Sequence, residues 1–152
     1  MEIFVISICN KNDQLLNSFA NKYIKNIENF YKINFIDISF NAKKKEKNIY
    51  ENEGKKALSY VKDNSVLIGM DPSGNNVSSI EFANKLQFWQ QNFSFLYFFI
   101  GGPDGLPQPV KNKVDALLSL SKLTFPHQLV KIILSEQLYR SICIMNNHPY
   151  HR

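Results

Sequence analysis

The chain has 152 residues, of which 44% are hydrophobic and 20% are charged, and its formal net charge is +5. This composition excludes a disordered protein, and the length suits one domain, residues 1–152, better than two. The basic surface favours a polyanion such as RNA, but a lysine-rich composition bias would produce the same charge, and both explanations stay open.

The first part of the chain predicts a strand, a helix and a second strand. Residues 3–8 form a continuous apolar run between polar residues, which is typical of a buried parallel strand. Asn12 or Asp13 can cap a helix in which apolar residues recur at helical spacing as far as Phe30. Residues 33–40 partly alternate and predict the second strand.

The next segment predicts a helix and a third strand. The lysine-rich run at residues 43–47 is either a solvated face or an RNA contact, and we favour the solvated face. Residues 49–61 predict a helix that only Gly54 interrupts. The strand predicted at residues 66–68 runs into Asp-Pro-Ser-Gly-Asn at residues 71–75, which favours a turn.

A helix and the most apolar strand follow. Ser78 or Ser79 can cap a helix that carries Leu86 and, less regularly, an aromatic pair. Residues 95–100 form the most apolar stretch of the chain and predict a central strand. This strand opens directly into Gly-Gly-Pro-Asp-Gly at residues 101–105.

The last part of the chain completes an alternating pattern. It predicts a short helix at residues 110–118, a last strand at 118–123 and an amphipathic helix at 128–144. Strand and helix thus alternate without a repeat or a linker. This order predicts an α/β fold with a mainly parallel sheet and helices on both faces.

Nothing in the chain predicts a membrane or a secreted protein. No apolar run approaches the ~20 residues of a membrane span, and the first residues lack a basic signal region. Cys9 and Cys143 lie in apolar stretches and share no metal-like spacing, so we expect reduced core cysteines. We therefore expect a cytoplasmic protein with no metal site.

Ligands of parallel sheets bind beyond the carboxyl ends of the strands, which makes three loops candidates for the site. These loops are residues 71–75, 101–105 and 119–127. The glycine-rich loop fits neither a Walker loop nor a dinucleotide-binding fingerprint, so from its residues it is either a ligand-binding loop or a tight turn.

The C-terminus is unusual because Tyr150, His151 and Arg152 crowd its end, close to His148. On composition alone this tail is either a frayed end or part of a site. Its histidines lack a nearby cysteine or carboxylate to complete a zinc site, and the chain has no Gly-x-Ser-x-Gly elbow of a serine hydrolase.

Four segments together carry a recognisable pattern. They read Ile-Gly-Gly-Pro-Asp-Gly-Leu at residues 100–106, Leu-Ser-Leu-Ser-Lys-Leu-Thr-Phe-Pro-His at 118–127, Glu-Gln-Leu-Tyr-Arg at 136–140 and Tyr-His-Arg at 150–152. In order, spacing and total length, this chain resembles the ribosomal RNA large-subunit methyltransferase H family.

The resemblance implies a fold, a reaction and a donor pocket. The fold is the SPOUT α/β class with a C-terminal trefoil knot, and the protein works as a homodimer. The reaction transfers a methyl group from S-adenosyl-L-methionine to N3 of a pseudouridine in 23S rRNA of the assembled ribosome. Carried over by position, the donor pocket comprises Met70, Gly102, Ser121, Lys122, Leu123, Thr124, Phe125 and Pro126.

The chain departs from the family pattern at two places. Met70 stands where the family has leucine and keeps an apolar contact, whereas Asn75 replaces a lysine, which puts an RNA role at this position in doubt. The loop after the first strand also lacks the usual glycine. Neither change removes the implied pocket.

Methylation of an imide nitrogen needs in-line placement and loss of a proton. We hypothesise that Tyr150, His151 and Arg152 form the acceptor side, with His151 as base, Tyr150 as a stacking or hydrogen-bonding group and Arg152 stabilising negative charge. Arg140 either shares that last role or pairs with Glu136 one helical turn away.

The acceptor side could come from a second subunit, because a partner could place its tail over the neighbour's donor. We expect His127 to hold the donor loop in shape. Two other functions stay open: a SPOUT methyltransferase with another RNA substrate such as transfer RNA, and a non-catalytic RNA-binding protein.

Overall fold

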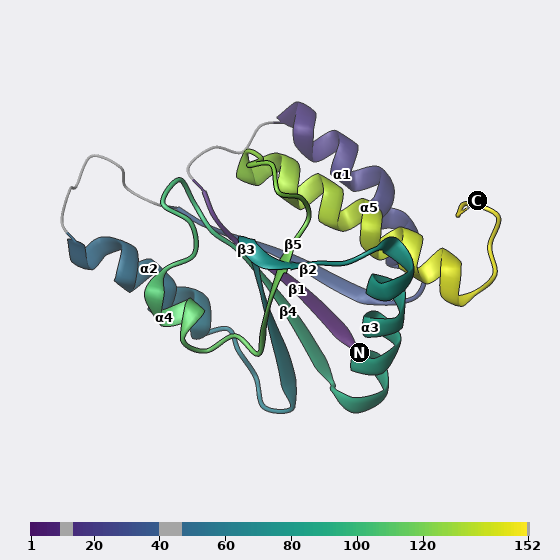
Figure 1. Ribbon diagram of the computed structural model, residues 1–152, viewed down its shortest axis with the longest axis horizontal. Coiled ribbons are helices and arrows are strands. Elements are labelled where there is room, and N and C mark those ends of the chain that lie inside the picture. The colour runs from purple at the N-terminus through teal and green to yellow at the C-terminus, as the bar shows by residue number, and fades with distance from the viewer. Residues whose placement is uncertain (10–13, 40–46, 152) are drawn as a thin grey trace.

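The structure, a computed structural model, describes residues 1–9, 14–39 and 47–151. Within these residues, one sheet of five strands has the order β2-β1-β4-β3-β5, and every neighbouring pair is parallel (Figure 1). The predicted parallel sheet is therefore confirmed. The strands are β1 (Glu2–Ile8), β2 (Lys32–Ile38), β3 (Ser65–Asn76), β4 (Phe95–Ile100) and β5 (Ala116–Ser119).

Helices cover both faces of this sheet, as predicted. Helix α5 packs between α1 and α3 over one face, and α2 packs with α4 over the other (Figure 1). No helix of the described residues is both long and apolar enough to cross a bilayer. The helices are α1 (Gln14–Ile27), α2 (Lys47–Leu58), α3 (Ser79–Asn92), α4 (Gln108–Lys111) and α5 (His127–Met145).

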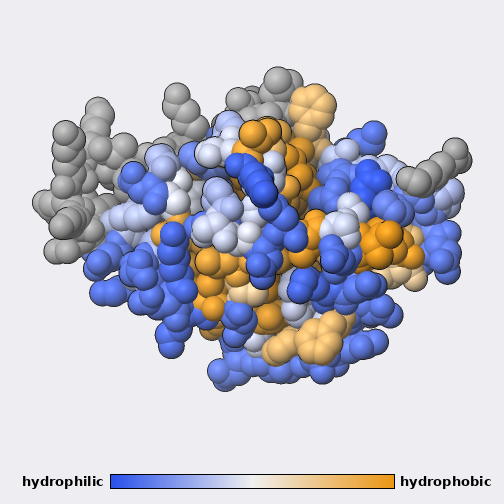
Figure 2. Space-filling model, in the orientation of Figure 1, coloured by the Kyte–Doolittle hydropathy of each residue, from blue (hydrophilic) through white to orange (hydrophobic). Residues whose placement is uncertain are grey.

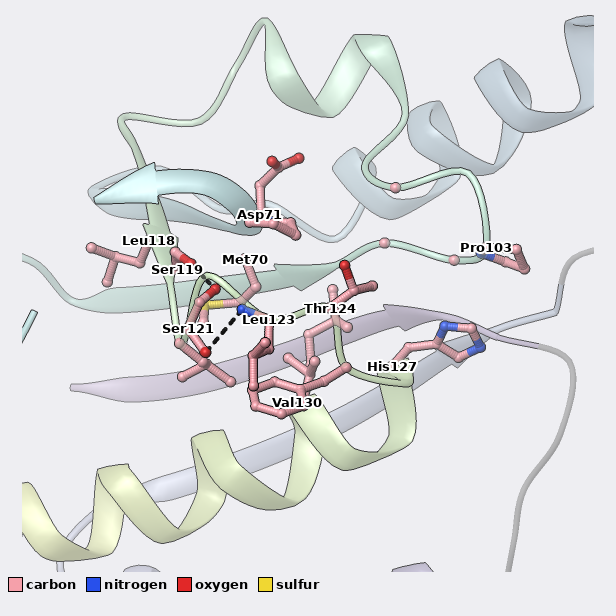
Figure 3. A pocket seen from close by; sticks show the side chains of 17 residues that line it. Met70, Asp71, Pro103, Leu118, Ser119, Ser121, Leu123, Thr124, His127 and Val130 are labelled. Carbon is pink, nitrogen blue, oxygen red and sulfur yellow. Dashed lines mark hydrogen bonds between the residues drawn. The ribbon is translucent and has the colours of Figure 1, made fainter. Parts of the chain in front are cut away.

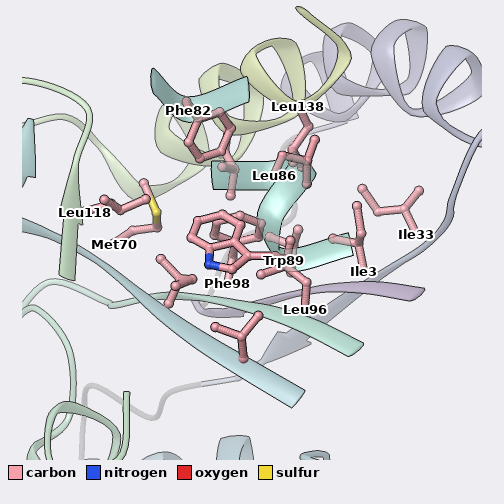
Figure 4. Close-up of a cluster of buried hydrophobic side chains, with 14 of the residues drawn as sticks. Ile3, Ile33, Met70, Phe82, Leu86, Trp89, Leu96, Phe98, Leu118 and Leu138 are labelled. Atoms are coloured by element: carbon pink, nitrogen blue, oxygen red, sulfur yellow. The ribbon is translucent and has the colours of Figure 1, made fainter. Parts of the chain in front are cut away.

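The core explains why β4 is the most apolar segment of the chain. This strand is the third of five, and helices cover both faces of the sheet at this position. Leu96, Tyr97 and Phe98 are therefore fully buried. Phe98 packs under α3, where the Trp89 ring lies 6.2 Å from its centroid, and Leu86 completes this layer (Figure 4). On the other face a smaller cluster joins the sheet to α2 and α4.

The start of α3 was predicted correctly and has a clear cause. The Ser78 hydroxyl accepts a hydrogen bond from the Glu81 N–H at 3.2 Å, and the Ser78 N–H donates to the Glu81 carboxylate at 2.7 Å. This reciprocal capping box fixes the first turn of the helix. Ile80 and Phe88 lie on the same helix but are more than half exposed, so not every apolar residue of the pattern belongs to the core.

The turn predicted at residues 71–75 is wrong, because β3 continues through this segment to Asn76. Its pairing with β5 shifts register between Met70 and Asn75, so the turn-forming sequence makes an irregular strand. Gly74 permits this path, since a Cβ there would lie only 2.6 Å from the main-chain carbon of Leu117.

The last strand and the helix before it are also shorter than predicted. Helix α4 ends at Lys111, and Leu117 and Leu118 belong to β5. Strand β5 ends at Ser119 rather than at Leu123, because its pairing with β3 ends where Asn76 meets Ser119. Residues 120–126 therefore form a loop.

Several other sequence predictions can be placed. Cys143 is buried and Cys9 is half-buried, and both are free thiols. Gly54 lies inside α2 without interrupting it. The helix caps proposed at residues 12 and 13 lie outside the described residues, as do Phe40 and residues 43–46 of the lysine-rich run.

Candidate functional site

A cavity of about 260 Å³ opens where the carboxyl ends of β3, β4 and β5 meet the start of α5 (Figure 3). Ligands of parallel sheets bind at this edge because the loops of adjacent strands converge there. Most of the lining is apolar side chain or glycine, and Ser119, Ser121 and Thr124 add hydroxyl groups. We call this space the donor cavity.

The structure brings together most of the residues predicted to bind the methyl donor. They come from the end of β3, the loop after β4 and the loop after β5, so the fold joins three separate segments. Lys122 and Pro126 are exposed and do not line the cavity. The predicted residues that do line it are Met70, Gly102, Ser121, Leu123, Thr124 and Phe125.

Other residues of the lining were not among the predicted donor-binding residues, although Asp71, Ser119 and His127 belong to the candidate loops at 71–75 and 119–127. Asp71 follows Met70, and Leu118 and Ser119 come from β5, where Leu118 pairs in register with Met70. His127 and Val130 line the cavity from the first turns of α5, so His127 supports the cavity wall directly. The register of β3 and β5 determines these neighbours, and no local pattern in the sequence reports that register.

Three glycines allow the loop after β4 to fold back on itself. A Cβ at Gly101 would lie 2.2 Å from the main-chain carbonyl group of Gly105, and one at Gly102 would lie 2.9 Å from the Ile8 carbonyl oxygen. Gly105 has a φ of +82°, which side chains rarely allow. The glycine-rich loop is therefore a tight turn that also forms one wall of the donor cavity.

A side chain from α2 fastens this turn. The Tyr50 hydroxyl accepts a hydrogen bond from the Gly102 N–H at 3.1 Å and donates one to the Gly105 carbonyl. Burial raises the pKa of Tyr50, and the Gly102 N–H opposes that shift in part. The hydroxyl thus stays protonated and can serve both ends of the turn. Tyr50 was not predicted, since it lies about 50 residues before the loop in the sequence.

The loop after β5 is held by its own hydroxyl groups. The Ser119 hydroxyl donates to the Ser121 carbonyl at 2.7 Å, and the Ser121 hydroxyl accepts from the Leu123 N–H at 3.0 Å (Figure 3). Thr124 and Phe125 make no hydrogen bond to another described residue. Their main-chain groups therefore remain available to a ligand in the cavity.

Asp71 supplies the only carboxylate among the described residues that line the donor cavity. One of its oxygens accepts hydrogen bonds from the N–H and the hydroxyl of Ser73, at 2.9 and 2.7 Å. The other oxygen lies 3.2 Å from the ammonium nitrogen of Lys111, which does not line the cavity. Burial alone raises the pKa of Asp71, but Ser73 and Lys111 outweigh it and hold this pKa below its ordinary value.

Three of the residues predicted for the acceptor side, Arg140, Tyr150 and His151, form a second group together with Glu136, and we call these four residues the tail cluster. Glu136 Oε1 accepts two hydrogen bonds from Arg140, at 2.9 and 2.6 Å, and one from the Tyr150 hydroxyl at 3.2 Å. The Arg140 guanidinium lies 4.9 Å from the Tyr150 ring centroid, and its Nη1 lies 3.4 Å from His151 Nδ1.

Arg140 makes the helix-turn ion pair with Glu136 that the sequence offered as one of two roles. This pair raises the pKa of Arg140. The guanidinium also contacts Tyr150 and His151. Burial raises the pKa of Tyr150, so this phenol is neutral at physiological pH. Arg152 lies outside the described residues.

Within one chain, the tail cluster and the donor cavity do not meet. Helix α5 begins at His127, which lines the cavity, and Arg140 follows 13 residues later on the same helix. At about 1.5 Å per residue this separation is roughly 20 Å along the helix axis. The nearest pair, Val130 of the cavity and Glu136 of the cluster, is roughly 9 Å apart along the same axis.

Among the residues that the structure describes, no group of three or more histidine, cysteine, aspartate or glutamate side chains could hold a metal ion. His148 and His151 of the C-terminal segment make hydrogen bonds within the protein instead. His148 Nδ1 accepts a hydrogen bond from the Tyr150 N–H at 3.2 Å, and His151 contacts Arg140.

Comparisons with known proteins cover the whole chain. Residues 1–151 match the family described as "Predicted SPOUT methyltransferase". A protein of Legionella pneumophila named ribosomal RNA large subunit methyltransferase H is 41% identical over all of this chain and 99% of its own length. The protein of the same name from Acholeplasma laidlawii is 39% identical, and the alignment covers both chains fully.

A solved structure, a probable methylase family protein from Haemophilus influenzae, has a similar fold. The two folds agree with a TM-score of 0.59 over 99% of this chain and 70% of that chain, at 15% sequence identity. At this identity the likeness supports the fold alone.

Proposed function

Because the chain belongs to the ribosomal RNA large subunit methyltransferase H family of SPOUT methyltransferases, we propose that it methylates N3 of a pseudouridine in 23S rRNA. The methyl donor is S-adenosyl-L-methionine, and the substrate is the assembled ribosome in the cytoplasm. The observation that carries this proposal is that motif residues distant in the sequence line one cavity.

The donor cavity fits the chemistry of S-adenosyl-L-methionine. Its volume of about 260 Å³ lies just below the ~300–1,000 Å³ that is typical of small-molecule sites. Ile100, Leu118 and Val130 offer apolar surface to an adenine ring, and the free main-chain groups of Thr124 and Phe125 can hydrogen-bond its polar edge. When bound, the donor supplies a methyl group activated by a sulfonium.

The tail cluster is suited to the acceptor side of the reaction. An arginine only donates hydrogen bonds, so in the Arg140 contact Nδ1 of His151 acts as the acceptor. His151 can accept the N3 proton at that nitrogen once Arg140 leaves it. The released guanidinium can then stabilise the negative charge that develops on the uracil ring.

We further propose that two subunits combine their sites, with the tail of one subunit meeting the donor cavity of the other. This arrangement is supported because no residue of the tail cluster lines the donor cavity of its own chain. Hydrophobic side chains gather at the surface where α5 begins (Figure 2), and Leu123 there is 70% exposed. We also propose that the chain forms one domain with the C-terminal trefoil knot of its family.

Methylation of intact ribosomes, free 23S rRNA and transfer RNA tests the substrate directly. We expect incorporation of labelled methyl groups only with ribosomes, and a loss of about 10²–10⁴-fold in single-turnover rate for His151→Ala. An unchanged rate at saturating ribosomes would remove the catalytic role of His151. Transfer of methyl groups to transfer RNA would instead support the alternative substrate.

Two further measurements test the remaining parts of the proposal. Calorimetry should detect binding of S-adenosyl-L-methionine, and its absence would favour a non-catalytic RNA-binding protein. In mixed dimers, one subunit lacks the tail after Asn147 and the other carries a blocked donor cavity. If tails act across the interface, activity should require the intact tail and the intact cavity to lie on different subunits.

A further inference from the structure

The donor cavity contains one unusual electrostatic feature, the carboxylate of Asp71. No other acidic side chain, and no lysine or arginine, is among the described residues that line the cavity. In Figure 3 the Asp71 side chain rises from the irregular part of β3 on the side of the cavity that faces α4. A bound ligand therefore meets a single fixed negative charge in a largely apolar wall.

The surroundings of Asp71 keep this charge in place. Its side chain is 9% exposed, and both hydrogen bonds from Ser73 point to one oxygen. Lys111 contacts the other oxygen at 3.2 Å and does not itself line the cavity. The lowered pKa of Asp71 agrees with an ionised group at physiological pH. The ammonium of Lys111 weakens the electric field of the carboxylate, but only the carboxylate belongs to the cavity wall.

The donor and the product of the proposed reaction differ in charge. S-adenosyl-L-methionine carries a sulfonium, whereas S-adenosylhomocysteine has lost the methyl group and carries a neutral thioether. Their adenosine and amino-acid groups are the same. A fixed anion close to the sulfur therefore distinguishes the two molecules by a term that apolar contacts do not provide.

We propose that Asp71 makes the donor cavity prefer the cationic methyl donor to its neutral product, and that Lys111 limits this preference. This inference rests on the proposed function. It assigns Asp71 a role in donor selectivity and in product release, because the attraction disappears when the methyl group leaves. Lys111 then has the opposite effect, since it weakens the field of the carboxylate.

Two substitutions with opposite expected signs test this assignment. Asp71→Asn keeps the shape of the side chain and removes its charge, and Lys111→Met removes the opposing charge from a partly exposed side chain. A partly screened carboxylate close to a cation changes a binding constant by on the order of tenfold. We expect Asp71→Asn to lower the affinity ratio of donor to product by about that factor, and Lys111→Met to raise it severalfold.

Isothermal titration calorimetry of the full chain with each molecule measures this ratio. Glu2→Gln is the matched control. Glu2 also pairs with a lysine, Lys32, at 2.9 Å. It lies at the start of β1, at the amino ends of the strands, whereas the donor cavity opens at their carboxyl ends. Its ratio should equal that of the wild type. Circular dichroism and thermal melting show whether each variant is folded.

Three results would overturn the inference. Equal weakening of donor and product in Asp71→Asn would mean that Asp71 contacts a group that both molecules share, or that it only supports the loop. Unchanged affinities for both molecules in that variant would mean that the charge of Asp71 does not act on the sulfonium. If Asp71→Asn does not fold, Lys111→Met decides, and an unchanged or lowered ratio there overturns the inference. A wild-type protein that binds neither molecule would contradict the proposed function itself.

Discussion

Replacing Tyr50 with phenylalanine should weaken donor binding, although Tyr50 does not line the donor cavity. The substitution keeps the ring in place within the cluster beneath α2 and removes only the hydroxyl. That hydroxyl bonds the Gly102 N–H and the Gly105 carbonyl, which are the two ends of the tight turn. Without it, the turn loses the contact that fastens it to α2.

The magnitude follows from the two hydrogen bonds. Each contributes about 0.5–1.5 kcal/mol, so their loss should cost about 1–3 kcal/mol of unfolding free energy. For a chain of this length each kilocalorie lowers Tm by about 2–4 °C. If the donor must reorder the loosened turn, the same free energy weakens binding by about fivefold to 150-fold.

Calorimetry with S-adenosyl-L-methionine and a thermal melt on the same preparation test this reasoning. Tyr60→Phe is the control, since this side chain is 40% exposed and the control removes a hydroxyl away from the cavity. It should match the wild type in both measurements. The reasoning is refuted if Tyr50→Phe binds the donor within twofold of wild type, whatever its Tm, because the hydroxyl would then have no influence on the cavity.

Three further predictions concern the tail cluster, an acid transition and the core. Glu136→Gln removes the carboxylate that holds Arg140, so methylation of ribosomes should fall at least about tenfold while calorimetry finds donor affinity within about twofold of wild type. The lowered pKa of Asp71 stabilises the fold above the unfolded-state value of 3.8, and this stabilisation is lost as pH falls through the folded value. The Tm of Asp71→Asn should therefore decline less than that of wild type between about pH 5 and about pH 3. Leu86→Ala should cost about 2–5 kcal/mol in urea denaturation, whereas Ile80→Ala at an exposed site should cost under about 1 kcal/mol.

The order of helices and strands could be predicted because apolar patterns are local. The run at residues 95–100 is apolar throughout since β4 is covered on both faces, and the Ser78 cap needs only its own helix turn. Boundaries were less predictable. The ends of β3 and β5 depend on their mutual pairing, so residues 71–75 form an irregular strand despite their turn-forming sequence.

The candidate site was predictable in part. Motif residues such as Gly102 and Thr124 carry over by position from a family with the same loops, and both line the donor cavity. Tyr50 was missed because it acts on the loop from α2, about 50 residues earlier in the chain. Asp71 was predicted only as part of the candidate loop at residues 71–75 and was given no role of its own.

From the sequence alone, the fold class, the family and the segments that line the donor cavity could be predicted, because each depends on short-range patterns and motif spacing. The tertiary structure decided which side chains share the cavity, that Asp71 lines it while paired with Lys111, and that the tail cluster lies outside it, farther along α5. Distances between segments depend on strand register and helix packing. These in turn depend on contacts between residues far apart in the chain, which no local pattern encodes.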